Sequence, residues 1–230
     1  MYCQLVAICG CVSSGIQHAL ANLPETLDET YEHILREIKK ENWKFAHRLL
    51  QFVALALRPL RAKRLAELLA FDFEAGPIPK FCEDWRLRDP VQAVLSTCSS
   101  LLSIVSHKFD DTEKPREVVQ FTHFSLKEFL TSPRLADAND MNLRRFHISV
   151  IPAHTLAARA CLGYLLHLNK DVRVINKSVR KLHFTQYSAD HWVSHALLDD
   201  VLPSVKEGLK ELFDPSKPHL AVCIWIRECS

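Results

Sequence analysis

Apolar residues recur every three or four positions along most of this chain, a spacing that is typical of amphipathic helices. In the N-terminal part this pattern predicts helices over residues 3–21, 27–38, 43–57 and 65–69. The third helix is expected to end before Arg58-Pro59, because the residue that precedes a proline disfavours helical geometry. Thr26 and Glu29 form a capping box that starts the second helix.

The period changes in the middle of the chain. Asp89-Pro90 is typical of a helix start, and the helix over 89–100 precedes two short apolar, β-branched runs at 101–106 and 118–122. The polar stretch between these runs predicts a β-hairpin. A second capping box, Ser125 to Glu128, then opens a helix that ends at Ser132-Pro133, with Ser125 as its cap.

Helical spacing returns in the second half of the chain. It covers residues 142–168, where Pro152 is expected to divide the stretch into two helices, and residues 184–213. The sequence therefore predicts a mainly α fold: a winged helix over 40–133, made of three helices and a β-hairpin wing, followed by an α-helical bundle over 134–230. Gly76 to Pro79 is expected to be a loop.

Composition narrows the classes of partner. Lys and Arg number 29 against 27 Asp and Glu, so the net charge of +2 gives no strong field for nucleic acid or an anionic membrane. The helix over 89–100 carries no Lys or Arg and offers only Gln92 for reading bases. No apolar stretch is long enough to span a membrane. The eight cysteines lie mainly in apolar runs, which favours free thiols in a reducing, cytoplasmic compartment.

Motifs for catalysis are missing from these residues, so we expect no catalytic residues and no enzyme. The chain has no glycine-rich phosphate loop, serine elbow, His-Glu-x-x-His pair or Cys-x-x-Cys pair. His191 and His195 lie four residues apart, and Leu197 to Asp200 ends in two carboxylates. Neither feature has an obvious further ligand at standard spacing, so we expect no metal site there.

His123 is the candidate binding residue, because it lies where the second strand of the hairpin meets the next helix. The first amides of a helix and its dipole favour an anion, and an imidazole beside them could donate to a phosphate oxygen. The alternative is a structural histidine that bonds a neighbouring carbonyl group. Position in the sequence leaves both interpretations open.

Five stretches together resemble one known family. They are Leu23-Pro24-Glu25-Thr26-Leu27-Asp28-Glu29-Thr30-Tyr31, Arg58-Pro59-Leu60, Cys98-Ser99-Ser100-Leu101, Phe121-Thr122-His123-Phe124-Ser125-Leu126-Lys127-Glu128-Phe129-Leu130 and Tyr187-Ser188-Ala189-Asp190-His191-Trp192. In this order they are similar to the segment downstream of the NTPase core in fungal NACHT proteins, catalogued as a GPI inositol-deacylase-type winged helix and usually followed by ankyrin repeats.

The resemblance implies a regulatory and coupling module of a NOD-like receptor of the STAND class. Residues 1–38 would then be the last helices of a truncated NACHT core, 40–133 the winged helix, and 134–230 a helical linker to a repeat sensor. His123 would contact the β-phosphate of ADP in the resting state. Implied partners are the NTPase core and ankyrin-type repeats of the same cytoplasmic protein, with homo-oligomers on activation.

Departures from the family limit what this chain can do alone. Its residues include no phosphate-binding loop, magnesium aspartate or ankyrin array, so ADP and ATP are implied for the full-length protein and no cofactor for this chain. The deacylase of the family name is not carried over, because the serine elbow is missing. The alternatives are a stand-alone protein-interaction module, a degenerate gene fragment and, third, a winged-helix nucleic-acid binder.

Overall fold

The computed structural model describes residues 26–107, 116–168, 183–198 and 200–228 of the chain. The helix expected over 3–21 lies outside these residues. The first described helix is α3 (Leu27–Glu37), and its start confirms the predicted cap: the Thr26 side chain accepts a hydrogen bond from the Glu29 backbone amide at 3.2 Å. The start of α3 is therefore set locally, by a hydrogen bond between residues three positions apart.

The predicted helices of the next segment are confirmed: those expected over 43–57 and 89–100 are shorter in the structure, and the one expected over 65–69 begins three residues earlier. They are α4 (Trp43–Leu55) after the 3₁₀ turn η1 (Lys40–Asn42), α5 (Ala62–Ala66) continued by η2 (Glu67–Ala70), and α6 (Pro90–Cys98), preceded by η3 (Glu83–Trp85) and followed by η4 (Ser99–Leu101). Asp89 caps α6, because its carboxylate accepts from the Gln92 amide at 3.0 Å.

The predicted hairpin is also confirmed. Strands β3 (Leu102–His107) and β4 (Arg116–Phe121) pair antiparallel, with Leu102 opposite Phe121. Leu60, between α4 and α5, forms a bridge to Val119 on β4, whose amide donates to the Leu60 carbonyl at 2.7 Å. One residue of the α4–α5 connection thus extends the hairpin on the free edge of β4.

A second small sheet flanks the loop that the sequence predicts at Gly76 to Pro79. Strands β1 (Phe71–Asp72) and β2 (Lys80–Phe81) pair antiparallel, and residues 73–79 join them. The strands were not predicted, because two residues each are too few to show a period. The loop is held against α10 (Val150–His167): Arg159 donates to the carbonyls of Pro77 and Gly76 at 2.5 and 2.7 Å.

The second half of the described chain is helical, with breaks at different places from those predicted. After α7 (Ser125–Leu130), α8 (Pro133–Ala136) and α9 (Met141–Arg144) come α10, α12 (Thr185–Ala196), α13 (Leu202–Leu212) and α14 (His219–Glu228). Pro152 does not divide a helix. It lies in the first turn of α10, where the amide that proline lacks would have no acceptor within the helix.

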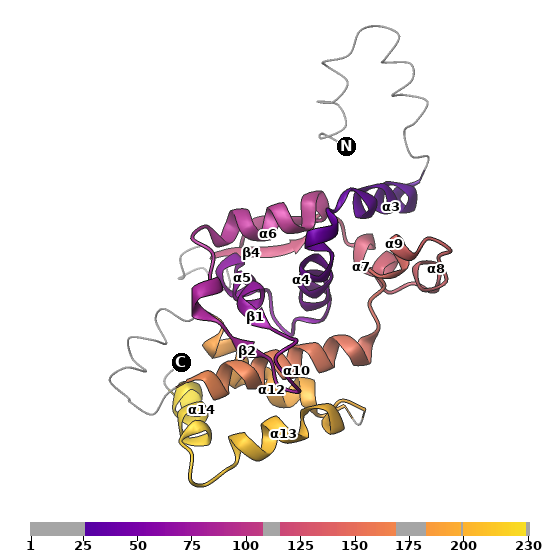
Figure 1. Cartoon of the computed structure of the whole chain (residues 1–230). Helices are drawn as coiled ribbons and strands as arrows, with labels where there is room; N and C mark the ends of the chain where they lie inside the picture. The colour runs from indigo at the N-terminus through magenta and orange to yellow at the C-terminus, as the bar shows by residue number, and fades with distance from the viewer. Residues whose placement is uncertain (1–25, 108–115, 169–182, 199, 229–230) are drawn as a thin grey trace, which may run out of the picture.

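Helix α10 lies at the centre of the molecule (Figure 1), beneath α4, β1 and β2, with α13 and α14 on its other side. Buried apolar side chains form one connected core from Tyr31 in α3 to Ile226 in α14. Three of the four described cysteines, Cys98, Cys161 and Cys223, are buried in this core as free thiols. The described chain is therefore mainly helical, with two small antiparallel sheets.

The core crosses both predicted domain boundaries. Arg134 on α8 forms ion pairs with Asp28 and Glu32 on α3, at 2.8 and 3.1 Å, and Arg36 pairs with Asp140 at 3.1 Å. Helix α3 thus packs on residues that follow position 133 as well as on those that follow position 40. Boundaries at 38/40 and 133/134 stay predictions.

Candidate functional site

His123 lies in the short turn between β4 and α7, as the sequence predicts. Its Nδ1 atom is 2.7 Å from the Ser125 hydroxyl oxygen and 3.3 Å from the Ser125 backbone nitrogen. A backbone N–H can only donate, so Nδ1 must be the acceptor and the ring hydrogen must sit on Nε2. This geometry sets the tautomer and makes Nε2–H a donor.

Ser125 connects the histidine to a buried tyrosine. The Ser125 hydroxyl is 2.8 Å from the Tyr31 hydroxyl, and because it donates to His123 it accepts from Tyr31. Tyr31 belongs to α3, is only 4% exposed and packs its ring 5.5 Å from that of Phe129. A hydrogen-bonded chain therefore runs from the core of the molecule to the surface imidazole.

Two details of the sequence prediction are wrong here. Ser125 does not cap α7: it is the first helical residue, Phe124 holds the cap position, and the Ser125 side chain bonds Tyr31 and His123 instead. The first amides of the helix are also not free. Those of Ser125, Leu126 and Lys127 donate to His123 Nδ1, His123 O and Phe124 O at 3.3, 3.2 and 3.3 Å.

A phosphate at this junction would therefore meet the imidazole rather than the backbone. Nε2 of His123 has no hydrogen-bond partner in the described part of the chain, and the residue is exposed. Phe124 beside it is 77% exposed, with its ring centroid 4.4 Å from that of His123. The turn thus offers an oriented N–H donor next to an uncovered aromatic face. Such a surface can bind an anionic oxygen and an apolar group together.

The other histidines singled out by the sequence are packing residues. His195 is 1% exposed, and its ring nitrogens lie 2.9 Å from His154 Nδ1 and from the Tyr187 hydroxyl. His191 packs its ring 4.7 Å from that of Tyr187. Asp199 lies outside the described residues, and within the described ranges no group of three His, Cys, Asp or Glu side chains could hold a metal ion.

Sequence reasoning missed Tyr31 as the anchor of this site. Tyr31 stands 94 residues before Ser125, and its helical spacing marks it only as part of a buried stripe. It also missed a cation-lined pocket beside α5 and η2, whose residues come from three separate segments of the chain.

Comparison with known proteins leaves the family of this chain open. No family model matches it. A similar curated protein is the azaphilone pigments biosynthesis cluster protein L of Monascus ruber, 28% identical over 178 residues that cover 76% of this chain and 36% of that protein. The chain therefore spans about a third of the length of this relative. No solved structure matches. Within the described residues no helix is both long and apolar enough to cross a membrane.

Proposed function

We propose that this chain is a non-catalytic regulatory and coupling module of a signalling NTPase, with residues 40–133 as its winged helix. The order of elements supports this interpretation: α4, the Leu60 bridge, α5 with η2, α6, and then the β3–β4 hairpin. Helices and a strand residue that precede a two-stranded wing in this order are typical of winged-helix domains. The likeness of the five sequence stretches to the NACHT-associated segment supports the same class.

The oriented imidazole of His123 is the observation that carries the proposal. Its Nδ1 is occupied by Ser125 and its Nε2–H is exposed, so the ring can donate to a β-phosphate oxygen of ADP without any rearrangement. An N–H donor fixed before the ligand arrives loses little freedom on binding. ADP, held by the NTPase core of the longer protein, would then favour the closed resting arrangement.

The same contacts suggest how release would be relayed. Tyr31 sits on α3, and α3 precedes the winged helix, so a displacement of α3 would break the Tyr31–Ser125 hydrogen bond and free the imidazole. Conversely, loss of ADP would remove the contact that holds the His123 turn to the NTPase core. Each ligand state thus favours one arrangement, which is a population shift between two conformations.

ADP retention in the complete protein that contains this chain tests the proposal. We expect His123→Ala to speed the loss of ADP after desalting by about tenfold, because a charge-assisted hydrogen bond is removed. Tyr31→Phe should have a smaller effect in the same direction, since it removes the anchor and keeps the imidazole. His33→Ala, an exposed histidine on α3, is the matched control. Unchanged ADP retention in His123→Ala would contradict the proposal.

A stand-alone protein-interaction module is the second candidate, and the exposed Phe124 favours it. An aromatic side chain that is 77% exposed is a common anchor at protein interfaces. On this interpretation the 230-residue protein is monodisperse, and it does not help an NTPase core to retain ADP. Phe124→Ser should abolish binding of its protein partner, whereas His123→Ala should not. The name of the relative offers one biological context, a biosynthetic gene cluster, and gives no reaction for this chain.

A further inference from the structure

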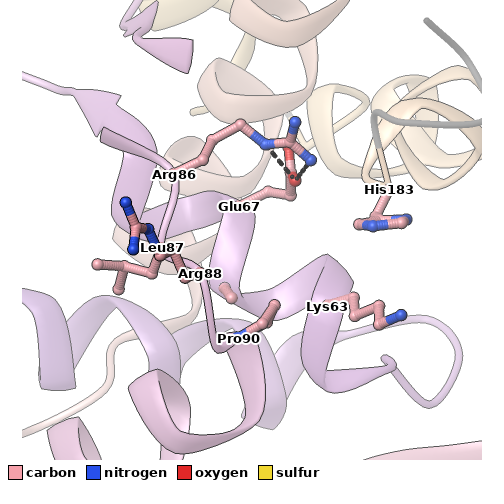
Figure 2. A pocket seen from close by; sticks show the side chains of 8 residues that line it. Lys63, Glu67, Arg86, Leu87, Arg88, Pro90 and His183 are labelled. Atoms are coloured by element: carbon pink, nitrogen blue, oxygen red, sulfur yellow. Dashed lines mark hydrogen bonds and ion pairs between the residues drawn. The ribbon is translucent and has the colours of Figure 1, made fainter. Parts of the chain in front are cut away.

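A pocket of about 320 Å³ opens between α5, η2 and the loop that leads into α6. Figure 2 shows the Arg86 guanidinium over Glu67, with the side chains of Lys63 and His183 across from it. Arg88 lines the same pocket from the loop before Pro90. The pocket shares no residue with the His123 junction. Its volume is at the lower end of those of small-ligand sites.

One of the cations at the pocket is held rigidly. Glu67 is only 5% exposed, and its Oε1 accepts hydrogen bonds from Nε and an Nη atom of Arg86 at 3.0 and 2.6 Å. Its Oε2 accepts from the hydroxyl of Tyr164 on α10 at 2.7 Å. Burial raises the pKa of Glu67, although both of these partners act against that change. Arg86 is therefore fixed in place before any ligand arrives.

Positive charge at the pocket exceeds negative charge. Among the residues that line the pocket, all of them in the described part of the chain, Glu67 alone carries a carboxylate, whereas Lys63, Arg86 and Arg88 carry positive charge. Lys63 and Arg88 are exposed and make no ion pair with the residues that the structure describes. The pKa of His183 is lowered by burial and by the positive charges of Arg86, Lys63, Arg64 and Arg61. A chain with a net charge of only +2 thus gathers cations at one place.

We propose that this pocket binds a small phosphate-bearing anion. Lys63 would supply the mobile ammonium group, Arg86 the fixed guanidinium and Arg88 further positive charge from the rim. His183, kept neutral by its surroundings, can donate one ring N–H to a phosphate oxygen. A group that carries two negative charges fits a pocket with a surplus of two positive ones better than a carboxylate does. The inference does not depend on the function proposed for His123.

Titration calorimetry of the 230-residue protein with sodium pyrophosphate, at constant ionic strength, tests this proposal. We expect saturable binding that Lys63→Ala weakens about tenfold or more, because a charge-assisted contact is lost. Lys63→Arg should retain most of the affinity. Lys206→Ala removes the same charge from the exposed face of α13 and should change nothing. Lys63 is exposed, so these variants should fold, which circular dichroism verifies.

Four results would overturn the proposal. The first is no saturable binding of pyrophosphate by the folded wild-type protein. The second is an equal loss of affinity in Lys63→Ala and Lys206→Ala, which would show unspecific attraction. The third is binding of a duplex DNA that depends on Lys63 without binding of pyrophosphate, which would make the pocket a nucleic-acid contact. Pyrophosphate affinity that depends on His123 and not on Lys63 would place the anion at the other site and also contradict this one.

Discussion

His195 lies in the core with both ring nitrogens engaged, by His154 on α10 and by Tyr187 on its own helix. Burial is the largest cause that lowers its pKa, to about 4, and the nearby His154 and His191 add to the effect. The imidazole therefore stays neutral in the folded protein over a range in which the unfolded chain would protonate it. At the scale of one residue, burial has turned a possible metal ligand into a packing residue.

The stability of the protein should depend on pH through this residue. The unfolded histidine, with a pKa of 6.5, binds more protons than the folded one, so stability falls as pH falls from about 6.5 towards 4. Between pH 7 and pH 5 the loss from His195 is about 2 kcal/mol. We expect His195→Gln to remove that part of the pH dependence in urea unfolding measured at both pH values.

His147→Gln is the matched control, because this histidine is only partly buried near the start of α10. Its urea unfolding at the same two pH values shows the effect of replacing a histidine outside the core. His154 and His191 also have lowered pKa values, so some pH dependence remains in His195→Gln. A variant that kept the full wild-type dependence would show that His195 is protonated in the folded state.

The loop between β1 and β2 packs against two helices, and two glycines permit this. A Cβ atom at Gly163 on α10 would lie 2.3 Å from the Pro79 carbonyl oxygen. A Cβ atom at Gly208 on α13 would lie 2.6 Å from the tip of the Ile78 side chain. The first obstacle is backbone and the second is a flexible side chain. At the scale of elements, glycine therefore sets how closely the loop approaches α10.

Alanine at these two glycines should have unequal effects. Gly163→Ala must displace the Pro79 backbone, and we expect it to lower the free energy of unfolding by about 2–3 kcal/mol. Gly208→Ala needs only a new Ile78 rotamer, and helix propensity favours alanine, so its net cost should be below about 1 kcal/mol. Urea unfolding of both variants compares them directly. Equal costs would mean that the loop is free to move away from α10.

The described residues of the molecule share one connected core, which argues against independent domains within them. Tyr164 on α10 bonds Glu67, His47 on α4 lies 3.1 Å from the His147 carbonyl, and the Ile148 amide donates to Leu130 at 2.8 Å. These contacts join the segment 40–133 to the segment that follows it. Buried apolar side chains continue across the same boundary.

We therefore expect the described chain to unfold as one cooperative unit. Trp43 on α4 reports on the first segment, and Trp192 on α12 reports on the second. Two variants, each with one of these tryptophans and phenylalanine at the other three tryptophan positions, should show the same urea midpoint by fluorescence. Circular dichroism of each variant controls for the substitutions. Two separate midpoints would show that residues 40–133 and 134–230 are independent domains.

Local signals in the sequence identified much of this fold. The caps at Thr26 and Asp89, the helical stripes and the two strands of the hairpin depend on residues a few positions apart. The position of His123 at the strand-to-helix turn followed from the same signals. Ser125 misled the prediction, because a serine at a helix start is usually a cap, and here its hydroxyl is taken by Tyr31 and His123.

The sequence by itself determined the hairpin, the residue at the turn and most of the helices, although not the breaks in the second half, because these features are favoured by contacts between near neighbours in the chain. Only the tertiary structure decided how His123 is held, since the Tyr31 hydroxyl that anchors it comes from 94 residues away. It also decided that Lys63, Arg86 and His183 line one pocket. Contacts between residues so far apart in the sequence depend on how the helices pack, and the spacing of residues along the chain does not predict them.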